Sequence, residues 1–210
     1  MKLRLSSLEK DVLKEIGNIG AGNATTSMSQ LTNKKILMDV PEVRVIPFDE
    51  VMQIVGGPDQ LVVGLYFKIF GEAPGSVYFI LSVEEAESII FDVTGGLKVD
   101  LLNTRNDDTV LGLSALQEVG NIITGSYLSA LADFTNLNMQ SSIPYLTIDM
   151  VGAILSVGLI ELSQISDYAI VIDTDLEDIS NKSGISSKFF FLPDIDTVPK
   201  IFSALGIDEL

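Results

Sequence analysis

The stretch Glu15-Ile16-Gly17-Asn18-Ile19-Gly20-Ala21-Gly22 recurs later in the same chain as Glu118-Val119-Gly120-Asn121-Ile122-Ile123-Thr124-Gly125. The two copies lie 103 residues apart, and the same offset pairs Pro41 with Pro144. A glutamate, an asparagine and a proline that recur at one offset indicate an internal duplication. We place the repeat halves at about 1–105 and 106–210.

Each half predicts the same order of elements: a long helix, an extended segment, a hairpin and a second helix. The first long helix spans residues 6–33, with Ser6 or Ser7 and Glu9 as its capping pattern. Its apolar spacing predicts a buried face, formed by Leu8, Val12, Ile16 and Ile19. The second long helix is expected over residues 109–134.

Two β-rich runs on either side of residues 71–75 predict a hairpin, and the run 76–81 resembles the run 187–192 at an offset of 111. The second half has therefore gained about eight residues, which we expect in the polar, turn-rich segment 173–184. This order predicts an α+β fold rather than a βαβ series. We expect one pseudo-twofold domain over 1–210, in which strands of both halves share a largely antiparallel sheet covered by helices.

The composition excludes several classes of chemistry. The chain has no cysteine and no histidine, which rules out disulfides, thiol nucleophiles, imidazole bases and zinc sites built from these residues. The net charge of −16 makes nucleic acid an unfavourable partner because phosphates would be repelled. The charged start of the chain and its short apolar runs predict a cytoplasmic protein without membrane insertion.

A polar row marks each long helix. Asp11, Glu15 and Asn18 occupy helical positions i, i+4 and i+7, which place them within about 60° of one another. The second helix repeats this row with Ser114, Glu118 and Asn121. A polar row at the edge of an apolar stripe is usually a solvated flank, but its duplication favours a functional role.

The glycines near this row need a separate explanation. A glycine inside a helix lowers stability by about 0.5–1 kcal/mol relative to alanine, yet the first helix holds Gly17, Gly20 and Gly22. Gly22 follows Asn18 by one turn, and Gly125 follows its counterpart in the same way. Close packing against another helix and clearance for a partner protein explain these glycines equally well.

The chain resembles the CheC/CheX/FliY family of chemotaxis phosphatases, whose pattern is (Asp/Ser)-x3-Glu-x2-Asn-x22-Pro. The pattern is met twice, by Asp11, Glu15, Asn18 and Pro41 and by Ser114, Glu118, Asn121 and Pro144. Within the family, one duplicated chain with two intact motifs is most similar to the CheC type. The two motifs begin with different residues, Asp11 and Ser114, so the two sites need not be equal.

The resemblance implies hydrolysis of the aspartyl phosphate on the response regulator CheY. On this reading Asn18 and Asn121 hold the attacking water, and Glu15 and Glu118 pair with the regulator's lysine. The supporting residues are Asp11, Ser114, Pro41 and Pro144, and Gly22 and Gly125 give the partner clearance. The chain needs no cofactor of its own, since the Mg²⁺ is expected in the regulator's active site.

The resemblance also implies a second partner, the receptor deamidase CheD, and we expect the chain to be a monomer when alone. The rival hypothesis is a non-catalytic adaptor that binds CheY or CheD through the same helices. A third possibility is a purely structural duplication whose polar rows are solvated helix flanks.

Overall fold

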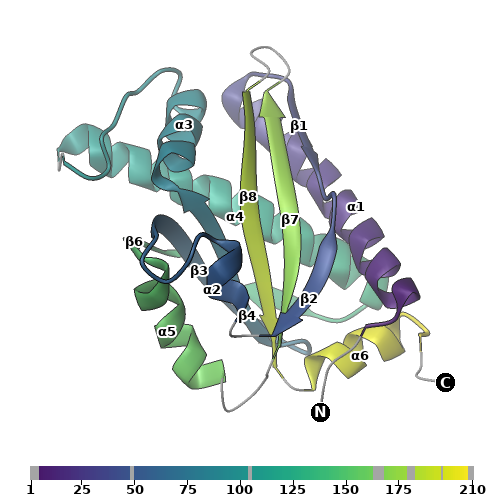
Figure 1. Ribbon diagram of the computed structural model, residues 1–210. Coiled ribbons are helices and arrows are strands. Elements are labelled where there is room, and N and C mark those ends of the chain that lie inside the picture. The colour runs from purple at the N-terminus through teal and green to yellow at the C-terminus, as the bar shows by residue number, and fades with distance from the viewer. Residues whose placement is uncertain are drawn as a thin grey trace.

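The computed structural model describes residues 5–47, 50–103, 106–162, 168–178, 183–194 and 196–207 (Figure 1). Its helices are α1 (Ser7–Thr32), α2 (Val51–Ile54), α3 (Val83–Val93), α4 (Asp107–Thr135), α5 (Val151–Leu162) and α6 (Thr197–Ala204). Its strands are β1 (Ile36–Asp39), β2 (Val43–Pro47), β3 (Leu61–Gly71), β4 (Gly75–Ser82), β5 (Met139–Ser141), β6 (Tyr145–Met150), β7 (Tyr168–Asp178) and β8 (Ser183–Pro193). The predicted α+β class is confirmed.

The strands of both halves form one sheet. Its order is β1-β7-β8-β4-β3-β5, with β2 also beside β7 and β6 also beside β3, and every pairing is antiparallel. The short strands β1 and β2 of the first half thus pair with β7 of the second half. In the same way β5 and β6 of the second half pair with β3 of the first. This exchange makes the sheet continuous across the duplication, as the sequence predicts.

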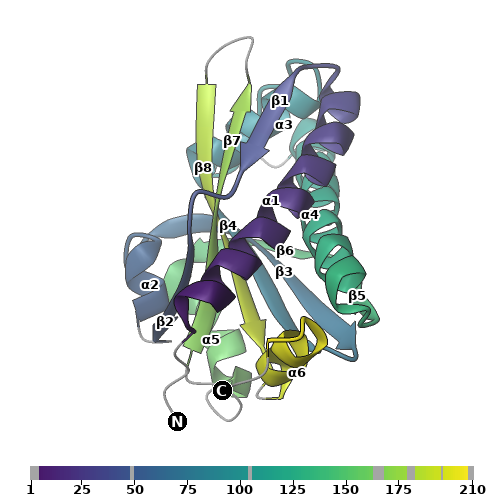
Figure 2. The same cartoon turned by 90° about the vertical axis from the view of Figure 1, so that its right-hand side faces the viewer.

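The two motif helices lie together on one face of the sheet, with α3 and α6, as Figure 2 shows for α1 and α4. Their inner faces join the larger apolar core, whose fully buried members include Phe67, Phe79, Leu116 and Ile123. The opposite face carries a smaller core, in which Val51 of α2 and Leu155 of α5 pack with Phe190. Each motif helix therefore has one face toward the sheet and another toward solvent.

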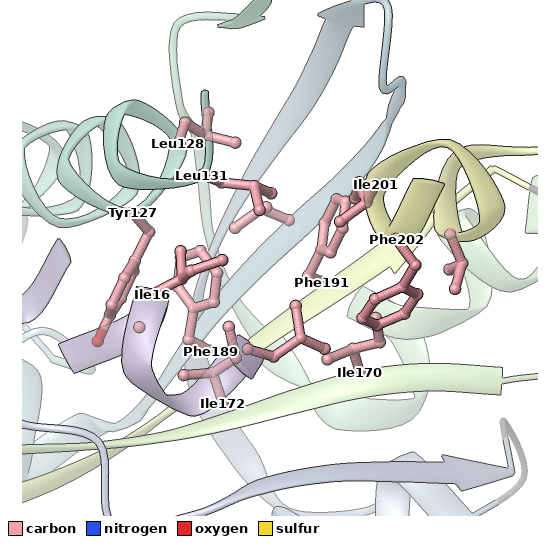
Figure 3. Close-up of a pocket in the computed structure, with 14 residues that line it drawn as sticks. Ile16, Tyr127, Leu128, Leu131, Ile170, Ile172, Phe189, Phe191, Ile201 and Phe202 are labelled. Carbon is pink, nitrogen blue, oxygen red and sulfur yellow. The ribbon is translucent and has the colours of Figure 1, made fainter. Parts of the chain in front are cut away.

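An apolar cavity of about 50 Å³ lies beneath α1, between the sheet and the other helices of that face (Figure 3). Ile16 and Gly17 line it from α1, Tyr127 lines it from α4, and Phe202 lines it from α6. Ile16 and Gly17 lie on the side of α1 that faces the cavity. The residues that flank them, Glu15 and Asn18, are therefore turned toward the outer side of the helix.

The predicted buried face of α1 is partly wrong. Leu8 is 57% exposed, and Val12 and Ile19 are only half-buried. The buried stripe is Leu13, Ile16, Gly17, Gly20, Ala21, Ala24 and Met28. The reason is that α1 packs closely on its neighbours through small residues, which rotates the helix so that the line of Leu8 faces solvent.

The segment 173–184, expected to be turn-rich, is strand wherever the structure describes it. Residues up to Asp178 belong to β7, and residues from Ser183 belong to β8, with continuous pairing from Ile170–Phe191 to Asp178–Ser183. The additional residues therefore lengthen a hairpin. Its polar residues do not prevent strand formation, because β1 pairs along the outer part of β7 and satisfies its backbone groups.

Candidate functional site

The first motif row follows the outer side of α1. Ser6 caps this helix, since its Oγ accepts from the Glu9 N–H at 3.2 Å while the Glu9 carboxylate accepts from the Ser6 N–H at 2.6 Å. Asp11 and Glu15 are exposed, and Asn18 is half-buried. The carboxylates of the row thus stand in solvent, and the amide lies closer to the sheet.

The second row repeats this arrangement on α4. Asn106 caps the helix by accepting from the Thr109 N–H at 2.9 Å. Ser114 and Glu118 are exposed, and Asn121 is half-buried like its counterpart. The structure therefore brings together the predicted Glu and Asn in each half and leaves both accessible from outside.

A hydrogen bond ties each motif proline to its motif helix. The Lys14 Nζ donates to the Pro41 carbonyl at 2.6 Å, and the Gln117 Nε2 donates to the Pro144 carbonyl at 3.3 Å. Lys14 and Gln117 occupy equivalent positions, each one residue before the glutamate of its row. The proline segments therefore lie against the helical turns that carry the Glu and Asn, which explains the fixed spacing between asparagine and proline.

The two asparagines differ in their contacts. The Asn18 Oδ1 accepts from the Val40 N–H at 2.9 Å, which leaves its Nδ2 for other partners. For Asn121, the described part of the chain offers no hydrogen bond to the side chain. Sequence analysis missed this difference because the residues that precede the two prolines, Val40 and Ile143, are both aliphatic.

This difference predicts unequal effects on stability. Asn18→Ala leaves the Val40 N–H without its acceptor in the interior, so we expect a loss of about 1–2 kcal/mol in the free energy of unfolding. Asn121→Ala removes no such partner, and we expect a change within about 0.5 kcal/mol. Urea unfolding of both variants measures the difference, and equal losses would contradict it.

The glycines divide into two groups by their surroundings. A Cβ on Gly20 would lie 2.6 Å from the Tyr127 Cδ1 and 2.9 Å from its Cα, so Gly20 allows α1 to cross α4. At Gly22 and Gly125, a Cβ would meet nothing within 4 Å. Close packing therefore explains Gly20, whereas the open space at the other two positions is available to a partner.

Alanine substitutions separate these two groups. We expect Gly20→Ala to lower the free energy of unfolding by about 1–3 kcal/mol because of the clash with Tyr127. Gly22→Ala and Gly125→Ala should each raise it by about 0.5–1 kcal/mol, since alanine favours the helix. Urea unfolding tests both directions. If Gly22 and Gly125 give a partner clearance, the same stabilised variants should also lose activity toward that partner.

The groups of the site permit few kinds of chemistry. Within the described ranges, no three Asp or Glu side chains come together as a metal site. Nor does any described helix have the length and apolar character to cross a membrane. Each row offers a carboxylate for ion pairing and an amide that can both donate and accept hydrogen bonds. Such a row can complement an active site on another protein, with the amide orienting a water molecule.

The fold and the rows define a class: a duplicated α+β protein that presents two equivalent Glu/Asn rows on neighbouring helices. The model of the CheC-like family matches residues 8–45 and 111–144, which hold both rows. The chain is 42% identical over 198 residues to the CheY-P phosphatase CheC of Bacillus subtilis strain 168, covering 94% of each protein. It therefore belongs to the CheC-like family.

Two further comparisons agree with this assignment. The chain is 29% identical over 143 residues to the flagellar motor switch phosphatase FliY of Bacillus subtilis strain 168, covering 67% of this chain and 35% of that protein. The crystal structure of Thermotoga maritima FliY matches with a TM-score of 0.74 and 21% identity, over 99% of this chain and 100% of that chain. The latter likeness establishes the fold, and the sequence-based family prediction is confirmed.

Proposed function

We propose that this chain is a phosphatase that hydrolyses the aspartyl phosphate of the response regulator CheY at two pseudo-symmetric sites. The observation that carries the proposal is the pair of accessible Glu/Asn rows in a chain 42% identical to a CheY-P phosphatase. Supporting it, both rows stand on the solvent side of helices whose other faces are held by the sheet.

In this proposal the asparagine of each row positions the attacking water. An acyl phosphate is already reactive, so a catalyst mainly has to hold a water in line with the phosphorus. An amide suits this role because it can donate and accept at once, so the Asn18 Nδ2 can donate to the water while its Oδ1 accepts from the Val40 N–H. Asn18 and Asn121 are half-buried, which limits their motion while leaving them within reach of a partner.

The glutamate of each row acts in docking. Glu15 and Glu118 are exposed, so each can form an ion pair with the active-site lysine of the regulator. Asp11 and Ser114 extend the row by one turn, while Pro41 and Pro144 hold the adjacent segment. The Mg²⁺ of the reaction belongs to the regulator, and this chain needs no cofactor of its own.

The proposal is tested by the loss of phosphate from phosphorylated CheY. We expect the wild-type chain to speed this loss beyond the regulator's own decay. Glu15→Lys with Glu118→Lys should weaken binding by at least about tenfold, since charge reversal sets two cations against each other. Titration calorimetry measures this affinity, and an unchanged affinity in the double variant would remove the proposed lysine pairing.

A second candidate function is an adaptor that binds CheY or the receptor deamidase CheD without turnover. The same exposed rows favour it, because docking alone needs only their surface. If the wild-type chain binds phosphorylated CheY but adds nothing to its decay even with CheD present, the adaptor function holds. We also propose that the chain works in the cytoplasm as a monomer when alone.

A further inference from the structure

Position 143 and its counterpart 40 hold aliphatic residues in opposite environments. Val40 is 1% exposed, whereas Ile143 is 88% exposed. Val40 packs against α1, since a Cβ on Gly17 would lie 3.4 Å from its Cγ2. At Gly120, the counterpart of Gly17, the nearest neighbours are Leu65 and Phe67 of β3. The segment before Pro144 therefore packs differently from the segment before Pro41.

Ile143 belongs to the segment that is hydrogen-bonded to the second motif helix. The next residue, Pro144, accepts a hydrogen bond from Gln117, which is adjacent in sequence to Glu118 and one turn before Asn121. This bond fixes the segment against the helical turn that carries the functional pair. The exposed Ile143 therefore belongs to a segment held against the second motif helix, whereas the first site has no exposed equivalent because Val40 is buried.

We propose that Ile143 is an apolar contact for the response regulator at the second site, and that it makes the affinities of the two sites unequal. The inference rests on the proposed phosphatase function, which brings CheY onto the row of Glu118 and Asn121. A partner that reaches Asn121 must also cover the adjoining segment. Burial of an exposed isoleucine strengthens binding in proportion to the apolar area removed from water.

Two single-site backgrounds isolate the effect. Asn18→Ala disables the first site and keeps the second intact. Asn121→Ala disables the second site and keeps the first intact. In the Asn18→Ala background we expect Ile143→Ser to raise KM for phosphorylated CheY about tenfold, with kcat within about twofold. In the Asn121→Ala background the same change should leave both parameters unaltered. A KM that stays constant in the first background, or rises equally in both, overturns the proposal.

The matched control is Leu31→Ser, which replaces an exposed aliphatic residue at the far end of α1, about 140° from the direction of Asn18. It should leave KM unchanged in both backgrounds. Because Ile143 is 88% exposed, Ile143→Ser leaves the core intact, and its urea unfolding curve should match that of the parent.

Direct binding separates a failure of this inference from a failure of the proposed function. The probe is CheY activated with beryllofluoride, a phosphoryl mimic that is not hydrolysed, and the measurement is titration calorimetry with the wild-type chain and with Ile143→Ser. We expect wild type to bind at two sites and Ile143→Ser to lose affinity about tenfold at one. Binding by both proteins with identical affinities overturns the role of Ile143 alone, whereas no binding by wild type overturns the proposed function and this inference together.

Discussion

Replacing Asn18 and Asn121 together by alanine is expected to lower the CheY-P phosphatase rate by about 100-fold. The amide of each row is the group proposed to hold the attacking water in line, and loss of such positioning has effects of this size. The measurement is the release of inorganic phosphate from phosphorylated CheY, after subtraction of the regulator's own decay. Each single variant should retain the activity of the other site.

Two controls accompany this experiment. Gln30→Ala removes an exposed amide from α1 at about 120° from the direction of Asn18, and it should leave the rate unchanged. Asn18→Ala is expected to be less stable than Asn121→Ala. The assay is therefore run well below the melting temperature of the less stable variant. If the folded double variant dephosphorylates CheY as fast as wild type, neither asparagine positions the water.

Asp173→Ala is expected to give the largest loss of stability, about 2–3 kcal/mol in the free energy of unfolding. The Asp173 side chain is 9% exposed, and its carboxylate accepts from the Arg44 guanidinium at 2.7 and 3.1 Å and from the Lys188 Nζ at 2.7 Å. These side chains come from three adjacent strands, β2, β7 and β8. Its removal leaves two neighbouring cations without their shared anion.

The expected loss lies below the usual range for a fully buried ion pair because the two cations are partly solvated. The side chains of Arg44 and Lys188 are 33% and 27% exposed, so water can compensate part of the lost interaction. The control is Asp175→Ala on the same face of β7, for which we expect a change within about 0.5 kcal/mol. Equal losses for Asp173→Ala and Asp175→Ala in urea unfolding would show that the cluster is not stabilising.

Local patterns in the sequence predicted the elements that bear the site. The capping residues Ser6 and Glu9 and the hairpin over residues 61–81 both reflect interactions between residues close in the chain. The repeated Glu/Asn spacing likewise depends only on helix geometry, because residues four and seven positions apart share one side. These features were therefore readable without a structure.

The exposure of Leu8 was predicted wrongly because the apolar pattern of α1 admits more than one buried face. Leu8, Leu13 and Ile16 all belong to apolar positions, but only the latter two face the sheet. Which face is buried depends on how closely α1 approaches α4, and the contact of Gly20 with Tyr127 sets that approach. A local pattern contains no information about that neighbour.

By itself, the sequence determined the duplication, the α+β class, the family and the two Glu/Asn rows. Only the tertiary structure decided which hydrogen bonds and surfaces surround each row. Val40 and Ile143 are similar side chains at equivalent positions. Val40 is buried against α1 and its N–H donates to the Asn18 Oδ1, whereas Ile143 faces solvent. Burial of an aliphatic side chain depends on neighbours distant in sequence, so the different surroundings of the two rows follow from packing.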